Sequence, residues 1–428
     1  ALGIRPVDPS QAQAFLRAWL ELTRRQQQVV CLTCMGHTNR QIARRLRISP
    51  NPFTARRTLR DRPAFGPNTI EEVRASVPGS VHAVPVWNLF PELSVGALAR
   101  VLGLARTEGP TTVLHTRQVA MARLALALKR RRPEVRVIAE MEGDDLAEVD
   151  YKRSKAHTAG PRRRLLWALE RRYYERAERE ILRDSDAVIC VSARLRDVMV
   201  ARFALSPAQA ARLHVIPTLA SRKEFFFDPG RRERTRRELG LEGRFVVVYS
   251  GNLRGRWQVP EKLVEAFLAI RDERRDAFFL VLTRAADRVY LQPLLERAGI
   301  GPADARLLPC PHARVVDHLC AGDIGLLLRE RHPMNEVAAP GKFAEYVLSG
   351  LPIVMTEGIG DFSAQMRGSE LACVLPDLDD AGEWRGGVQH FCRRDFTAEQ
   401  RATLSAWAGE RFAVEARVPE LATLYRSV

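Results

Sequence analysis

Short apolar runs and longer segments with helical apolar spacing alternate along most of the chain. A short apolar run bounded by glycine, proline or charged residues is typical of a buried strand, and apolar residues three to four apart are typical of a helix. Strands that alternate with helices pair in parallel, so the pattern predicts an α/β fold. The strand-like runs lie at 111–117, 135–143, 186–192, 213–217, 245–250, 278–284 and 353–355.

The first hundred residues allow two interpretations. Residues 9–22 and 93–106 have helical spacing, and 80–89 has the pattern of a strand. Residues 28–35 read as a further buried strand, but 22–51 also resembles the helix-turn-helix of LuxR-type regulators, without the usual Thr-Val-x-x-His continuation. We favour the strand, because a doubly wound sheet is built outward from its first strand and no other candidate precedes residue 80.

A proline, a glycine and a lysine mark a helix start near the C-terminal end. Pro340 and Gly341 break the backbone, and a helix is predicted to begin near Lys342 and to end at Gly350. The free N–H groups of a helix N-terminus, together with a lysine, suit a phosphate. Glu345, one turn later, can accept hydrogen bonds from the vicinal hydroxyls of a ribose. The alternative is an ordinary surface ion pair between Lys342 and Glu345.

Three motifs in the chain occur in a familiar order. Residues 246–253 read VVVYSGNL, 320–328 read CAGDIGLLL, and 339–354 read APGKFAEYVLSGLPIV. They resemble, in turn, the Y-S-G-x-L, A-A-D-I-G-L and S-P-x-K-x-x-E-Y-L-A-x-G-x-P-V-I motifs of group 1 (GT4-like) retaining glycosyltransferases. The resemblance is closest over about residues 236–370. It implies the GT-B fold, in which two Rossmann-like doubly wound domains face each other across a cleft.

The resemblance also implies a reaction and a donor site. The reaction is transfer of a sugar from a nucleotide-sugar donor with retention of configuration, and Lys342 and Arg254 would stabilise the leaving diphosphate. Many members place a glutamate eight residues before the one matching Glu345; this chain has Val337 there, with Glu336 one position earlier, so the role of Glu336 stays open. The implied donor-binding residues are Gly251, Asn252, Arg256, His312, Pro340, Gly341, Lys342 and Glu345. No metal or cofactor is predicted, because the nucleotide-sugar is a substrate.

The acceptor side is predicted from the carboxyl ends of strands, where ligands bind in open α/β sheets. Five polar residues follow or end strands in the first half of the chain: His37, His115, Arg117, Asp144 and Asp145. The resembling family often has D-x-R-G-D near the last two, whereas this chain has Glu142 in place of the arginine. Each of the five is an acceptor-site candidate, with an ordinary loop residue as the alternative.

The element order divides the chain into three parts. Residues 1–220 form an expected N-terminal Rossmann-like acceptor domain, of which 1–64 could instead be a separate helical segment. Residues 231–397 form an expected nucleotide-sugar domain, and 398–428 are expected to be helices that cross back to the first domain.

Positive charge is concentrated in the first half. Residues 1–235 carry 42 Lys and Arg against 24 Asp and Glu, whereas 236–428 carry 25 against 27. Such a basic half fits an anionic partner: a membrane surface, a lipid-linked phosphate or a nucleic acid. Residues 160–183 are arginine-rich and read as a helix with Leu165 and Leu169 on its apolar face; its arginines with Trp167 could contact anionic lipid headgroups, or form a solvated face.

Composition and short sequence patterns indicate where in the cell the protein is located and which partners it has. The chain has no apolar run long enough for a membrane-spanning helix and no signal-peptide pattern, and its seven cysteines are scattered. We therefore expect a cytoplasmic protein, with a peripheral contact to the inner membrane face through the basic half. The expected partners are a nucleotide-diphosphate sugar and an acceptor that is a polysaccharide, a lipid-linked glycan or a secondary metabolite. A DNA-binding regulator, or a non-catalytic nucleotide-sugar-binding scaffold, is the alternative function.

Overall fold

The computed structural model describes residues 95–101, 112–155 and 160–428. The predicted helix at 9–22, the strand or helix-turn-helix at 22–51, the strand at 80–89 and the candidate His37 lie outside the described residues. The predicted helix at 93–106 is described only as α5, Val95–Val101.

Four strands of the described residues form one sheet, in the order β1-β2-β3-β4. The first two pair in parallel with Arg117 opposite Glu140, as the intervening helix requires. The apolar side chains of β2 are buried, including Val135, Val137 and Ile138. The elements are β1 Thr112–Arg117, α6 Val119–Lys129, β2 Val135–Met141, α7 Asp145–Ser154, α8 Pro161–Asp184, β3 Ala187–Cys190, α9 Ala193–Arg202, α10 Pro207–Ala210 and β4 Leu213–Val215.

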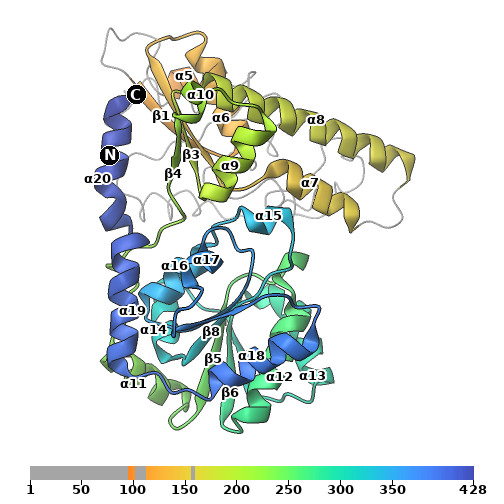
Figure 1. Cartoon of the computed structure of the whole chain (residues 1–428), viewed down its shortest axis with the longest axis vertical. Coiled ribbons are helices and arrows are strands. Elements are labelled where there is room, and N and C mark those ends of the chain that lie inside the picture. The colour runs from red at the N-terminus through yellow and green to blue at the C-terminus, as the bar shows by residue number, and fades with distance from the viewer. Residues whose placement is uncertain (1–94, 102–111, 156–159) are drawn as a thin grey trace. The chain divides into compact units, whose positions relative to one another are not determined.

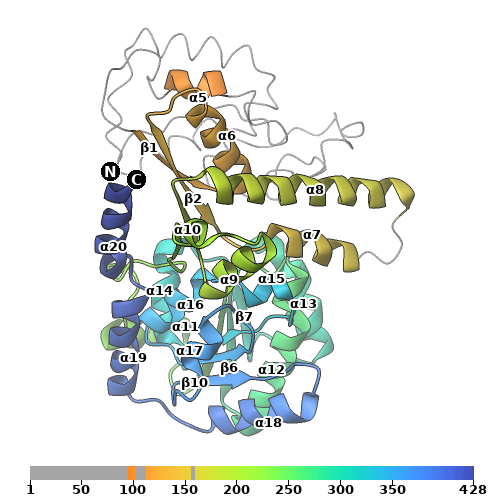
Figure 2. The same cartoon turned by 45° about the horizontal axis from the view of Figure 1, so that its top comes forward.

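Helix α8 is one uninterrupted helix of 24 residues (Figure 2). The prediction that Leu165 and Leu169 lie on its buried face was wrong: 62% and 49% of their surface is exposed. The reason is geometric, because residues four apart advance by about 40° around a helix, so a strict four-residue repeat drifts off one face within a few turns. Trp167, expected at an exposed basic surface, is buried, with the Arg163 guanidinium 5.1 Å from its ring centre.

Six strands form the second sheet, in the order β10-β9-β8-β5-β6-β7, with every recorded pairing parallel. Its sequence elements are α11 Pro229–Leu239, β5 Phe245–Ser250, η3 Arg256–Gln258, α12 Pro260–Glu273, β6 Ala277–Leu282, η4 Ala285–Asp287, α13 Arg288–Arg297, β7 Ala305–Leu308, α14 His312–Ala321, β8 Ile324–Leu327, α15 Pro333–Glu336, α16 Gly341–Leu348, β9 Ile353–Thr356, α17 Phe362–Met366, β10 Ala372–Leu375 and α18 Ala381–Cys392.

Helices cover both faces of this sheet (Figure 1), and each face has its own core. On one face α14, α16 and α17 pack, and the rings of Phe343 and Phe362 stack with their centres 4.1 Å apart. On the other face α12, α13 and α18 pack around the stacked rings of Phe267 and Phe279. Because both faces are covered, the strands are mostly apolar, and every residue of β5 is buried.

The order in which strands are added to the sheet reverses at β5. From β5 the strands run through β6 and β7 to one edge, and through β8, β9 and β10 to the other. The chain therefore leaves the carboxyl ends of the neighbouring strands β5 and β8 toward opposite edges of the sheet. In open parallel sheets such a switch point is where ligands bind.

Two helices, α19 Ala398–Arg411 and α20 Val414–Ser427, end the chain. The buried Arg401 of α19 donates through Nε to the carbonyl of Gly350 and through Nη2 to that of Cys320, which ties α19 to the turn after α16. Residues Glu142–Arg171 and Ile189–Ser427 form one compact unit, so α7, α9 and the six-stranded sheet are described together below. No helix among the described residues is long and apolar enough to cross a bilayer.

Candidate functional site

The predicted phosphate site lies at the switch point of the six-stranded sheet. Gly251 directly follows β5 with φ of +139°, a conformation that L side chains rarely adopt. A Cβ atom on Gly251 would lie 2.9 Å from Lys342 Nζ. Glycine at this position therefore lets the lysine from α16 reach across the end of β5.

Lys342 is held by two neutral oxygen atoms. Its Nζ atom donates to Tyr249 Oη and to Gln258 Oε1, both at 3.2 Å, and lies 4.4 Å from the centre of the Tyr249 ring. The Tyr249 hydroxyl in turn donates to the carbonyl of Asn252 at 3.1 Å. Among the described residues, no carboxylate forms an ion pair with Lys342, so the structure does not contain the surface pair with Glu345 that was the alternative interpretation.

A second cation, Arg329, follows β8 and was not predicted from the sequence. Its Nη1 atom donates to Asn335 Oδ1 at 3.0 Å, and its main-chain N–H donates to the Thr356 hydroxyl. Its Nε atom is buried and has no hydrogen-bond partner among the residues that the structure describes. Arg329 likewise forms no ion pair with any of them.

Burial lowers the pKa of both cations, and the charge of Arg329 lowers the pKa of Lys342 further. Burial, followed by repulsion from Arg329, lowers the pKa of Lys342 to about 7, although Glu345 opposes the shift. Burial lowers the pKa of Arg329 to about 10. Two partly dehydrated cations without a paired carboxylate are costly, and an anion bound between them would relieve that cost. The arrangement is therefore a candidate anion site.

The predicted catalytic Arg254 lies beside this site but is already paired. Its Nε atom donates to Oδ1 of Asp287 at 2.5 Å, and Arg284 binds the other oxygen of the same fully buried carboxylate. The Asn252 side chain accepts from the main-chain N–H of Arg254 at 2.7 Å and so shapes the loop. Arg256 begins the short helix η3.

Glu345 and His312, both predicted to bind the donor, lie close together in the structure. Their nearest side-chain atoms, Nε2 and Oε1, are 3.6 Å apart. The hydrogen bond to Glu345 raises the pKa of His312, against the opposing effect of burial. Pro340 precedes Gly341, the first residue of α16, so the helix begins one residue before the predicted start.

The acceptor candidates are placed in two groups. His115 and Arg117, at the end of β1, lie 3.4 and 3.2 Å from the Glu140 carboxylate, at the end of β2. Asp144 is 3% exposed, caps α7 by accepting from Ala147 N–H, and binds both terminal nitrogens of Arg202.

Asp145 is an acceptor candidate with a clearly shifted pKa. Burial, followed by repulsion from Glu148, raises the pKa of the Asp145 carboxyl group to about 8. A carboxyl group that is protonated at neutral pH can donate a hydrogen bond to a hydroxyl or phosphate.

Helix α7, which begins after Asp144, is joined to the loop that carries Arg329. Glu330 accepts hydrogen bonds from the Tyr151 hydroxyl at 2.6 Å and from Lys155 Nζ at 2.5 Å. The Tyr151 ring also contacts the edges of Trp257 and His332. The acceptor candidates on α7 and the anion site are thus connected through adjacent residues of one loop.

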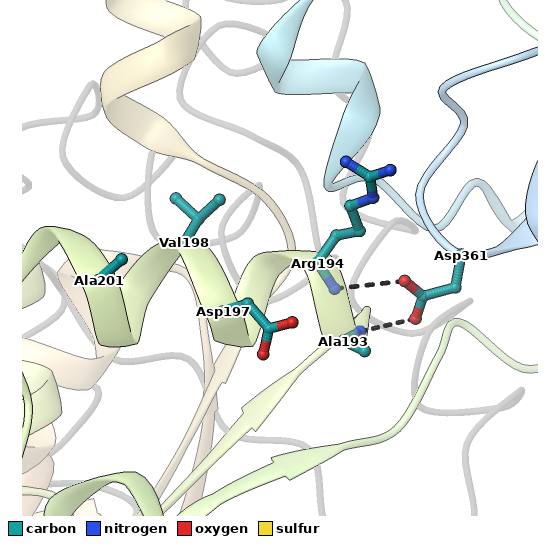
Figure 3. Close-up of a pocket in the computed structure, with 6 residues that line it drawn as sticks. All are labelled: Ala193, Arg194, Asp197, Val198, Ala201 and Asp361. Atoms are coloured by element: carbon teal, nitrogen blue, oxygen red, sulfur yellow. Dashed lines mark hydrogen bonds between the residues drawn. The ribbon is translucent and has the colours of Figure 1, made fainter.

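A further contact involves Asp361, in the glycine loop after β9. Its two carboxylate oxygens accept from the main-chain N–H groups of Ala193 and Arg194, at 2.6 and 3.2 Å (Figure 3). An aspartate at a helix N-terminus is favourable because it satisfies free N–H groups and the helix dipole. A pocket of about 520 Å³ lies along this side of α9, lined by Asp361, Arg194 and Asp197 among others.

The family comparison agrees with the motifs. Residues 20–220 match the family described as Glycosyltransferase Family 4. No curated protein matches the chain in sequence. The matched range includes the segment at 22–51 for which the sequence left two interpretations.

Solved structures match over most of the chain. A glycosyltransferase from Rickettsia africae ESF-5 superposes with a TM-score of 0.60 at 11% identity, over 84% of this chain and 88% of its own. Anabaena HepE in complex with UDP gives 0.58 at 15% identity, over 80% and 85%. WaaG, a glycosyltransferase involved in lipopolysaccharide biosynthesis, gives 0.51 at 17% identity, over 71% and 80%. At these identities the likeness shows the fold, which is GT-B.

Proposed function

We propose that this chain, a retaining glycosyltransferase of family 4 with the GT-B fold, takes its sugar from a nucleoside diphosphate sugar bound at the carboxyl ends of β5 and β8. One observation carries the proposal: Lys342 and Arg329 converge at the switch point, and neither forms an ion pair with a described residue. In this proposal residues 231–397 are the donor domain and residues 1–220 supply the acceptor side.

The diphosphate is proposed to lie between Gly251, Lys342 and the N-terminus of α16. Gly251 admits the close approach, and the free N–H groups of α16 add donors. Glu345, one turn along α16, is within reach of the ribose hydroxyls, with His312 beside it. The Anabaena HepE structures with UDP and UDP-glucose make uracil the first base to test.

The chemistry requires stabilisation of a leaving diphosphate. As the bond from the anomeric carbon to the phosphate oxygen breaks, the acceptor oxygen bonds to that carbon on the same face, and its proton passes to the departing diphosphate. Negative charge grows on the diphosphate during this step. Protonated Lys342 and Arg329 lie where they would stabilise it.

The acceptor is proposed to be a hydroxyl-bearing glycan, free or lipid-linked. His115, Arg117 and Asp145 offer groups that can hydrogen-bond hydroxyls or phosphates at the ends of β1 and β2. These residues support an acceptor that carries hydroxyl or phosphate groups. They do not specify which sugars the acceptor contains.

Replacing Glu345 by alanine tests the donor site. A nucleotide that binds only the folded protein, at about a hundred times its Kd, should stabilise it by roughly 2.7 kcal/mol. In a thermal-shift screen of UDP, GDP, ADP and their sugar conjugates, we expect one base to raise the Tm of the wild type and to have little effect on Glu345→Ala. The exposed Glu410→Ala is the matched control and should keep the shift.

Two results, from this screen combined with transfer and DNA-binding assays, would favour the rival functions. Nucleotide binding without release of sugar or transfer to any acceptor would indicate a non-catalytic scaffold. The absence of any nucleotide shift, together with DNA binding that weakens steeply with salt, would indicate a DNA-binding regulator.

A further inference from the structure

The first half of α8 carries an exposed stripe of leucine and arginine. The stripe consists of Arg162, Leu165, Leu169, Arg172 and Arg176, all of them exposed. Their spacing of three, four, three and four residues keeps them on one side of the helix. The stripe extends over four turns, or about 21 Å at 1.5 Å per residue. Trp167 and Ala177, on the other side of α8, are buried.

The positive charge of this stripe is not balanced within the described part of the chain. Among the residues that the structure describes, no carboxylate forms an ion pair with Arg162, Arg172 or Arg176. Leu165 and Leu169, with 62% and 49% of their surface exposed, are two of the most exposed large apolar side chains of the described chain. A stripe that combines exposed leucines with arginines lacking an acidic partner in the described ranges is unfavourable in water and has no role in the donor site.

We propose that this stripe of α8 docks the protein onto an anionic lipid surface. The arginines would contact lipid phosphates, and the two leucines would enter the boundary between headgroups and acyl chains. Two features favour a bilayer over other partners. The stripe has no aromatic residue to stack on bases and no Asn or Gln to read them, as single-stranded or sequence-specific nucleic-acid binding would use. Three like charges among its five positions oppose pairing with a second copy of the helix.

The proposal goes beyond the transfer reaction and does not rest on the donor site. It assigns the membrane contact that the basic first half suggested to a defined helix face. It also assigns a function to the exposed leucines, which a helix packed in a folded domain would normally bury.

Vesicle co-sedimentation of the full chain tests the proposal. We expect binding to vesicles of phosphatidylcholine with about 30% phosphatidylglycerol, weak binding to phosphatidylcholine alone, and loss of binding at high salt. Each arginine near such a surface is worth roughly a fivefold change in partition coefficient, so Arg172→Glu with Arg176→Glu should reduce binding by at least about 25-fold. Leu165→Ser with Leu169→Ser should reduce it as well, although it changes no charge.

A matched charge reversal elsewhere separates the stripe from net charge. Arg237 and Arg297 are exposed on α11 and α13, and Arg237→Glu with Arg297→Glu alters net charge by the same amount. This control should keep vesicle binding. Equal binding of the wild type to neutral and anionic vesicles, no binding to either, or an equal loss in the control would overturn the proposal. So would stripe variants that lose binding to a DNA duplex while vesicle binding is unchanged; circular dichroism and Tm confirm that each variant folds.

Discussion

Replacing Lys342 by methionine should abolish most transfer activity, with kcat/KM lower by about a thousandfold. The methionine keeps the length of the side chain but cannot stabilise charge on the leaving diphosphate, and loss of one such group typically costs a hundredfold to a thousandfold in rate. Initial rates of donor consumption, with the nucleotide found in the thermal screen, measure the effect. The exposed Lys223→Met is the control and should keep full activity.

The same substitution should stabilise the protein without ligand. The folded pKa of Lys342, about 7, lies below the ordinary value of 10.5, so the unfolded chain binds more protons between these pH values. The contribution of Lys342 to the free energy of unfolding therefore rises with pH across that window and is most unfavourable below pH 7. At pH 6 we expect Lys342→Met to be more stable than the wild type by about 2 kcal/mol, after allowance for partial exposure, and similar to it near pH 10.

A lysine with a structural role would give the opposite result. If Lys342 mainly holds Tyr249 and Gln258 in place, its replacement should lower Tm at every pH, and activity should fall only in proportion to the folded fraction. Denaturant unfolding at pH 6 and pH 9 distinguishes the two cases.

Replacing Arg329 by methionine should weaken binding of the donor nucleotide about a hundredfold. Its Nε atom is buried and without a partner among the described residues, so the guanidinium contributes little to folding that a methionine could not replace. Hydrogen bonds to charged groups are worth about 1.5–3 kcal/mol, which gives the expected change in Kd. Titration calorimetry with the nucleoside diphosphate measures it, and Arg329→Lys should restore part of the affinity.

Arg331, two residues later and exposed, provides a matched control. Arg331→Met should bind nucleotide as the wild type does. A drop of several degrees in the Tm of Arg329→Met, with nucleotide affinity unchanged, would show instead that Arg329 only supports Asn335.

Local signals in the sequence predicted the start of α16 well. Pro340 and Gly341 are strong breakers, and the structure begins α16 at Gly341, one residue from the expected start. The strand at 245–250 has the predicted bounds, because a fully apolar run between charged residues and glycine has few other solutions. The α/β class was predicted from the alternation of strand-like and helical segments, and the family resemblance from motifs that are each contiguous in the sequence.

Contacts between segments that are distant in the sequence could not be predicted from local patterns. Arg329 belongs to the site because β8 lies next to β5 in the sheet, which no local pattern around residue 329 indicates. The pairing of Arg254 with the buried Asp287 depends on the loop after β6 in the same way. The error over Leu165 and Leu169 had a different source, since a four-residue repeat was read as one face although it drifts around the helix.

The central claim is that a nucleoside diphosphate binds against Lys342 and Arg329, and proton uptake on binding tests it most directly. In the free protein, with a pKa near 7, Lys342 is mostly neutral at pH 8; a bound diphosphate restores its charge. Calorimetry at pH 8 in buffers of different ionisation enthalpy should show uptake of nearly one proton per nucleotide by the wild type, on the order of 0.9. No net uptake by the wild type, or the same uptake by Lys342→Met, would contradict the account.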